Sequence, residues 1–244
     1  MRRPLRTRSK LSAPCTAGVV LLHGIAGRSL MLRRMERALQ RAGFATLNLD
    51  YQSRKKPLGE LAEDIHHAIA VFAAAHPGPI HFVTHSMGGL LARVYIARHR
   101  PTRLGRVVML GTPNGGSEVA DRLKHISLYR AYFGPAGLQL VTTKDATLAA
   151  LPPLDYEVGT IAGNRFLDPI SALLLLPWPN DGRVSVESCK LDDMADHTTV
   201  KASHMGLLVH PTSVRQTIAF LRHGRFETVR SMWRTARDAH RVAG

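Results

Sequence analysis

The chain has 244 residues, of which 45% are hydrophobic, and a formal net charge of +15 at pH 7. This apolar content suits one packed domain of ordinary size and excludes an intrinsically disordered chain. No apolar run reaches the roughly 18 to 20 residues that cross a bilayer, so a membrane-spanning helix is excluded as well.

The N-terminal segment is basic and holds no acidic residue. Its charges are Arg2, Arg3, Arg6, Arg8 and Lys10. No apolar segment follows before Pro14, so we expect no secretory signal and a cytoplasmic protein. An Arg-rich leader without acids is also typical of organelle transit peptides, which is the alternative at this end of the chain.

Short apolar strands alternate with helical stretches from residue 17 onward. The expected strands are 17–22, 44–49, 80–84, 107–110, 157–162 and 198–201, and the expected helices are 30–42, 58–75, 87–98 and 213–222. This alternation is typical of a parallel sheet with helices on both faces. The sequence therefore predicts an α/β fold with a mostly parallel central sheet.

Residues 114–155 interrupt the alternation. The stretch is too long for a plain connection, and we expect short helices that cap a site. Its apolar side chains would suit a hydrophobic acyl group: Leu123, Ile126, Leu128, Tyr129, Tyr132, Phe133 and Leu138. We predict a single domain over residues 1–222 with this cap insertion.

Residues 223–244 predict a basic amphipathic C-terminal helix or tail. Arg230, Arg234, Arg237 and Arg241 recur at helical spacing opposite Phe226, Val229, Trp233 and Ala236. Such a helix either docks on the domain through its apolar stripe or binds an anionic membrane surface.

Ser86 stands where an expected strand meets an expected helix, within residues 83–89 (VTHSMGG). A serine there lies on a tight turn with its hydroxyl exposed, and small neighbours are needed because the strand and the helix approach closely. Gly88 and Gly89 meet that need. We predict that Ser86 is a nucleophile; the alternative is that it only caps the helix.

Two backbone N–H groups are expected to form an oxyanion hole. The N–H of Met87 lies at a helix N-terminus, where the field favours negative charge. The N–H of Ile25 lies in the glycine-bearing loop 23–27 (HGIAG), directly after the first strand. Both groups can face the oxygen of a tetrahedral intermediate beside Ser86.

A serine nucleophile needs a base and a carboxylate that orients the base. Of the 13 histidines, His204 lies between the last expected strand and the last expected helix, where loops of a parallel sheet gather, and His197 is a weaker candidate. Asp181, in the Asn-Asp-Gly turn, is the expected carboxylate, and its competitor is Asp168.

These residues together resemble the α/β-hydrolase superfamily, and within it the lipase and esterase group that carries an HG oxyanion loop and an HSMGG nucleophile elbow. The likeness covers most of residues 17–222, and residues 111–117 (GTPNGGS) are similar to the GTP-x-x-GS segment of these lipases. The resemblance implies cofactor-free hydrolysis of a carboxylic ester through an acyl-enzyme on Ser86. Thr84 departs from the family pattern, since it replaces the first glycine of GxSxG.

We therefore predict a serine hydrolase that acts on small-molecule or lipid-like esters without a cofactor or a metal, and Cys15 and Cys189 are expected to be ordinary thiols. The same three side chains would serve an acyltransferase or a thioesterase. The alternative from a different functional class is a non-catalytic basic module that binds membranes or nucleic acid. For the enzyme, an anionic membrane surface is a further expected partner, and nucleic acid is not.

Overall fold

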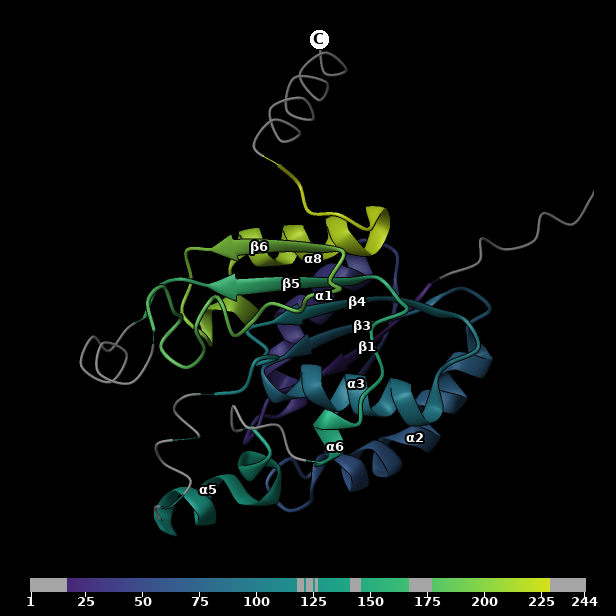
Figure 1. The fold of residues 1–244 in the computed structure, drawn as a ribbon. Coiled ribbons are helices and arrows are strands. Elements are labelled where there is room, and N and C mark those ends of the chain that lie inside the picture. Colours follow the sequence, from purple (N-terminus) through teal and green to yellow (C-terminus); the bar gives the residue numbers. More distant parts are fainter. Residues whose placement is uncertain are drawn as a thin grey trace, which may run out of the picture.

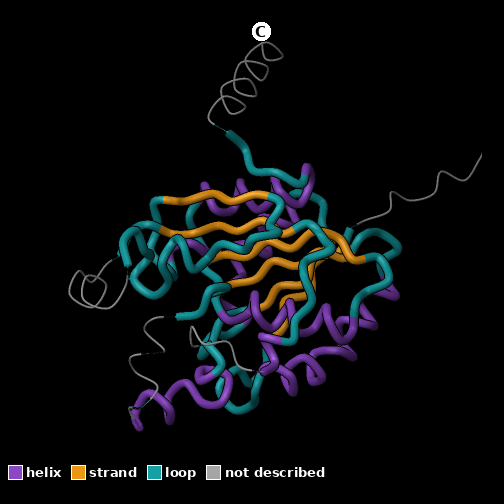
Figure 2. Tube along the Cα trace, in the orientation of Figure 1, coloured by secondary structure: helices purple, strands orange, loops and turns teal. Residues whose placement is uncertain are grey.

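The protein is described by a computed structural model that covers residues 17–117, 121, 125, 127–140, 146–166 and 177–228 (Figure 1). Its centre is a six-stranded sheet, and helices lie on both faces of that sheet (Figure 2). This architecture confirms the predicted α/β class.

The strands follow the order β2-β1-β3-β4-β5-β6, and every neighbouring pair is parallel. Their bounds are β1 Gly18–Leu22, β2 Ala45–Leu49, β3 Ile80–His85, β4 Leu104–Leu110, β5 Val158–Gly163 and β6 Asp196–Val200. Strands β1, β3 and β5 are buried along their whole length because helices cover both faces. All six strands were predicted, with ends shifted by a few residues at most.

Helices form one layer on each face of the sheet. They are η1 Ser29–Leu32, α1 Arg33–Arg41, α2 Leu58–Ala75, α3 Met87–His99, η2 Gly206–Leu208 and α8 Pro211–His223. Val19 and Leu21 of β1 belong to the core beneath α1 and α8, whereas Val20 and Leu22 belong to the core beneath α2 and α3. Successive strand residues thus face opposite layers, as the period of two requires.

The described part of residues 114–155, the expected cap, contains the helices α5 (Ser127–Leu138) and α6 (Ala146–Ala149). Helix α5 is broken at Gly134, which has φ 64° and ψ −164° and precedes Pro135. The cap is fastened to the body, because the side-chain oxygen of Gln139 accepts a hydrogen bond of 2.7 Å from the N–H of Leu58, the first residue of α2. Five side chains proposed for the acyl site lie outside the described part: Leu123, Ile126, Leu128, Tyr129 and Tyr132.

Helix α8 ends at Gly224, whose φ of 70° suits a left-handed C-cap. Residues 225–228 then return to the body: the Phe226 ring packs 5.0 Å from the Phe220 ring, and the Phe226 N–H donates to the carboxylate of Asp196 over 2.7 Å. Residues 225–228 are not helical, and the rest of the C-terminal helix predicted over 223–244 lies outside the described residues. None of the helices in the described ranges has the length and apolarity to cross a bilayer.

Candidate functional site

Ser86 forms the turn between β3 and α3, at the carboxyl edge of the sheet, where the arrowheads point in Figure 1. Its backbone has φ 54° and ψ −128°, a conformation that residues other than glycine rarely adopt. Among the described residues, Ala26 (φ 55°) is the only other non-glycine residue with a positive φ. Such backbone strain costs about 1 to 3 kcal/mol per residue, and packing around the turn has to offset it.

Small residues let helix α3 approach strand β1 beneath Ser86. A Cβ atom on Gly88 would lie 2.5 Å from the carbonyl oxygen of Leu22, a backbone atom that cannot move aside. A Cβ atom on Gly89 would overlap the side chain of Thr112. The predicted need for small residues at both positions is confirmed.

The backbone of Ser86 is held on both sides. Its N–H donates to the carbonyl oxygen of Leu110, at the end of β4, over 2.9 Å. Its carbonyl oxygen accepts a hydrogen bond of 2.9 Å from the Thr112 hydroxyl. Thr112 belongs to the GTP segment that the sequence resemblance identified, but its bond to the nucleophile turn could not be inferred from the sequence.

Thr84, the departure from the family pattern, fits within the sheet. Its side chain is fully buried, and its hydroxyl donates to the carbonyl oxygen of Val108 in β4 over 3.3 Å. The larger residue is therefore accommodated with its polar atom paired.

Asp181 and His204 are in direct contact, and both are buried. Asp181 Oδ2 and His204 Nδ1 are 2.8 Å apart, and the His204 backbone N–H donates to the Asp181 carbonyl oxygen over 3.0 Å. Since a carboxylate oxygen only accepts, Nδ1 carries the proton of this bond, which leaves Nε2 of a neutral ring as an acceptor. This is the tautomer that a general base requires.

A tight turn holds the Asp181 carboxylate in place. Its Oδ1 accepts hydrogen bonds of 2.9 Å from the backbone N–H groups of Arg183 and Val184. Gly182 has φ 94°, and its N–H donates to the Asn180 side chain over 3.0 Å. One carboxylate oxygen is thus fixed by the backbone while the other is left for His204.

Two contacts bring His204 to the strand ends beside Ser86. The ring of His85 lies 4.6 Å from the ring of His204, and a Cβ atom on Gly111 would lie 3.1 Å from His204 Nδ1. His85 precedes Ser86 in the chain, and Gly111 follows the residue that accepts the Ser86 N–H. Within the described residues no hydrogen bond joins the Ser86 hydroxyl to His204; catalytic hydrogen bonds of unliganded enzymes often tighten only with substrate.

The ring of His85 supports His204 through a hydrogen bond to its backbone. Its Nε2 donates to the carbonyl oxygen of His204 over 3.1 Å. Burial, together with the neighbouring His204, holds the pKa of His85 well below its ordinary value of 6.5. The structure thus identifies the backbone atom of His204 that His85 supports.

The loop 23–27, where the oxyanion hole was expected, lies against the turn at Ser86. A Cβ atom on Gly24 would lie 3.0 Å from the Cβ of Ser86. The Gly27 N–H donates a hydrogen bond to the Gly24 carbonyl oxygen, and the Ala26 N–H donates one to the Ser53 hydroxyl. The N–H groups of Ile25 and Met87, in contrast, donate to no acceptor in the described part of the chain. They remain available for an oxygen atom of a ligand.

His197, the rival base, does not lie at this site. His197 lies inside β6, three strands from β3 and therefore roughly 14 Å away, and its Nδ1 is 2.7 Å from the Thr160 hydroxyl oxygen. Asp168, the alternative carboxylate, falls outside the described residues, as does Cys15. Cys189 is buried. In the ranges that the structure covers, no three His, Cys, Asp or Glu side chains are grouped for a metal.

A family model described as alpha/beta hydrolase fold matches residues 19–134 of the chain. Two triacylglycerol lipases, from Pseudarthrobacter phenanthrenivorans and Burkholderia plantarii, are each 31% identical to the chain over 117 residues, which is 44% of this chain. The matched region covers 36% and 32% of these lipases, so the chain spans about a third of their length.

Solved structures share the fold over a longer stretch. The mature lipase BlEst2 of Bacillus licheniformis superimposes with a TM-score of 0.66 and 21% identity, covering 89% of this chain and 96% of that one. The thioesterase RedJ of Streptomyces coelicolor superimposes with a TM-score of 0.56 and 15% identity, covering 91% of each chain. At such identities the likeness establishes the arrangement of strands and helices.

Proposed function

The chain has the fold of the α/β-hydrolase superfamily, and we propose that it is a serine hydrolase that cleaves lipid-like carboxylic esters through an acyl-enzyme on Ser86. The hydrogen bond between His204 and Asp181 supports this proposal most directly. It joins a base and a carboxylate in the required tautomer at the sheet edge that carries the strained turn of Ser86.

In the proposed reaction, Ser86 Oγ attacks the ester carbonyl carbon while His204 Nε2 takes the hydroxyl proton. Asp181 stabilises the resulting imidazolium, and the N–H groups of Ile25 and Met87 bind the oxyanion. His204 then protonates the departing alcohol. Water attacks the acyl-enzyme in the same way, and the acid leaves as Ser86 regains its proton.

The titled relatives set the substrate class that we propose. Two relatives are named triacylglycerol lipases, and the family model matches the part of this chain that carries the proposed nucleophile and oxyanion loop. A cytoplasmic location stays a prediction from the N-terminal sequence.

A fluorophosphonate probe tests the proposal without presuming a substrate. We expect labelling of Ser86, none in Ser86→Ala, and strongly reduced labelling in His204→Ala. His223→Ala, an exposed histidine at the end of α8, serves as the matched control and should label normally. Labelling at another serine, or equal labelling of the wild type and His204→Ala, contradicts the proposal. Chromogenic esters assayed with and without an added alcohol separate hydrolysis from acyl transfer.

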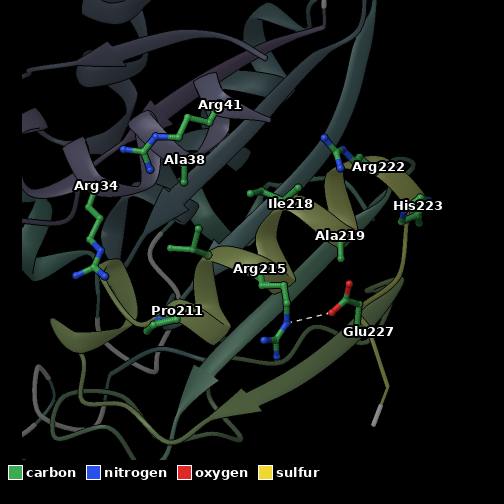
Figure 3. Close-up of a pocket in the computed structure, with 11 residues that line it drawn as sticks. Arg34, Ala38, Arg41, Pro211, Arg215, Ile218, Ala219, Arg222, His223 and Glu227 are labelled. Atoms are coloured by element: carbon green, nitrogen blue, oxygen red, sulfur yellow. Dashed lines mark ion pairs between the residues drawn. The ribbon is translucent and has the colours of Figure 1, made fainter. Parts of the chain in front are cut away.

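We also propose that the protein contacts anionic lipid surfaces through a groove between α1 and α8 (Figure 3). Arg34 and Arg41 stand seven residues apart on α1, and Arg215 and Arg222 stand seven residues apart on α8, so each pair spans about 10 Å along its helix. These arginines rim a cavity of about 470 Å³. Glu227, paired with Arg215 over 3.1 Å, is the carboxylate among the lining residues.

The floor of this groove is apolar, with Ala38, Ile218 and Ala219 between the arginines. A cationic rim around an apolar floor suits anionic amphiphiles. Sedimentation with phosphatidylcholine vesicles that contain phosphatidylglycerol should pull down the protein at low salt, and Arg34→Ala/Arg41→Ala should weaken binding. Equal binding to vesicles of phosphatidylcholine alone would contradict the proposal, as would no binding at low salt.

A further inference from the structure

A second cavity opens directly beside the oxyanion loop. It has a volume of about 640 Å³ and is lined by residues 26–28 and 50–55; we refer to it as the loop cleft. The turn closed by the Gly27 N–H and the Gly24 carbonyl oxygen separates it from the nucleophile. Gly24 lies against Ser86 on one side of this turn, and Ala26 lines the loop cleft on the other.

The walls of the loop cleft are preformed. The Tyr51 ring stacks on the His23 ring with centroids 4.0 Å apart and planes 6° from parallel, and the Tyr51 hydroxyl donates to the His23 carbonyl oxygen. Burial raises the pKa of Tyr51 far above its ordinary value and lowers that of His23, so this wall adds no charge. Ser53 is buried and accepts the Ala26 N–H over 3.1 Å. The walls therefore also hold the oxyanion loop.

The charge in the loop cleft is predominantly positive. Arg28, Arg54 and Lys55 lie there with a single carboxylate, that of Asp50. The Asp50 carboxylate accepts hydrogen bonds of 2.7 and 2.8 Å from the N–H and the hydroxyl of Ser29. These bonds lower the pKa of Asp50. Arg28 and Lys55 form no ion pair with a residue of the described ranges. Three cationic side chains and one carboxylate thus leave the loop cleft with an excess of positive charge.

We propose that the loop cleft binds an anionic group of the ester, a carboxylate or a phosphate, so that the enzyme prefers esters with a negative charge remote from the reacting carbonyl. This inference rests on the proposed function of Ser86. An ester carbonyl beside Ile25 and Met87 lies on one side of the turn 24–27, and its substituent can pass around that turn to Arg28 and Lys55. The positive charges of the loop cleft would strengthen the binding of an anionic ester but not that of a neutral ester.

Two matched pairs of esters test this preference. The acyl pair is mono(4-nitrophenyl) adipate against 4-nitrophenyl hexanoate, and the alcohol pair is 4-(hexanoyloxy)benzoate against 4-(hexanoyloxy)benzamide. In each pair the quantity of interest is kcat/KM for the anionic ester divided by kcat/KM for the neutral ester. Comparing this ratio between variants removes the intrinsic reactivity of the esters.

We expect the ratio of at least one pair to fall about tenfold or more in Arg28→Ala/Lys55→Ala. Asp50→Asn should raise the same ratio, an effect that loss of structure would not produce. Arg37→Ala, an exposed arginine of α1 outside the loop cleft, is the matched control and should leave the ratio unchanged. Added NaCl should lower the wild-type ratio, because screening weakens the attraction.

An unchanged ratio for both pairs in Arg28→Ala/Lys55→Ala overturns the inference, as does a lowered ratio in Asp50→Asn. If the wild type hydrolyses the neutral esters under those outcomes, the proposed function stands and only the loop cleft loses its role. If no ester is turned over and no fluorophosphonate label is found on Ser86, the proposed function has failed and this inference falls with it.

Discussion

The Nε2 atom of His85 donates a hydrogen bond to the backbone carbonyl oxygen of His204, 119 residues further along the chain, over 3.1 Å. The two rings also pack against each other, with centroids 4.6 Å apart. The residue before the proposed nucleophile therefore supports the proposed base, which links the two ends of the site through one buried side chain.

His85→Phe keeps a ring in place but leaves the His204 carbonyl oxygen unpaired. An unsatisfied buried acceptor costs about 1 to 3 kcal/mol, so we expect kcat to fall about tenfold or more while KM changes little. His85→Gln, whose amide can donate, should restore part of the loss. Equal kcat in His85→Phe and the wild type, or equal loss in both variants, would show that the bond does not position His204.

Asp181→Asn places an amide where His204 needs an acceptor. Asparagine Oδ1 would keep the bonds from Arg183 and Val184, so its NH₂ would face Nδ1 and favour the wrong tautomer. We expect kcat for a chromogenic ester to fall about 10³- to 10⁴-fold, as for the corresponding change in a serine protease triad. Asp193→Asn, an exposed aspartate, is the control; a similar loss in both variants would argue against the assigned role.

Ser86→Gly should unfold at higher urea concentration than Ser86→Ala, although both should be inactive. Glycine relieves the strain at φ 54° and ψ −128°, whereas alanine keeps it. Glycine also gains entropy in the unfolded chain, so we expect a net difference of about 1 kcal/mol in the free energy of unfolding. Equal or lower stability of Ser86→Gly would mean that the turn is not strained.

The His81→Asn variant should lose less stability in acid than the wild type. Burial lowers the pKa of His81 from 6.5 to about 4, and its Nδ1 accepts the Arg106 N–H over 2.7 Å. Below pH 6.5 the His81 ring therefore binds a proton in the unfolded chain, whereas in the folded chain it stays neutral down to about pH 4. The contribution of His81 to the free energy of unfolding is therefore fully present above pH 6.5 and decreases as the pH falls.

At pH 5 the difference amounts to about 2 kcal/mol relative to pH 7. Urea unfolding of the wild type and His81→Asn at both pH values measures it, since asparagine can keep the acceptor without titrating. A pH dependence as steep in His81→Asn as in the wild type would assign the acid sensitivity to other buried histidines.

Gly134→Ala should release the cap. A Cβ atom there would overlap the carbonyl group of Arg54, and the backbone conformation of Gly134 is nearly exclusive to glycine. We expect faster limited proteolysis of residues 127–138 and lower activity on long-chain esters. Gly43→Ala is the matched control, since Gly43 has φ 92° but open space around it. If both variants behave alike, strain alone accounts for the effect.

Local signals predicted the sheet well. Consecutive apolar residues such as 19–22 (VVLL), and the glycine pair after Ser86, identify a buried strand and a tight turn without distant information. Strand β4 begins at Leu104, three residues before its expected start. Edge strand β6, expected at 198–201 and found at Asp196–Val200, is mostly polar and half-buried. Its apolar pattern is therefore too weak to mark its start.

The amino-acid sequence by itself determined the order of strands and helices and the serine turn, since each depends on residues that adjoin in the chain. Only the tertiary structure decided that Asp181 meets His204, that His197 does not approach the serine, and that His85 and Thr112 support the site. The physical reason is that these contacts depend on the spatial order β1-β3-β4-β5-β6. That order brings strand ends far apart in sequence to one edge, and no run of neighbouring residues records which of them meet.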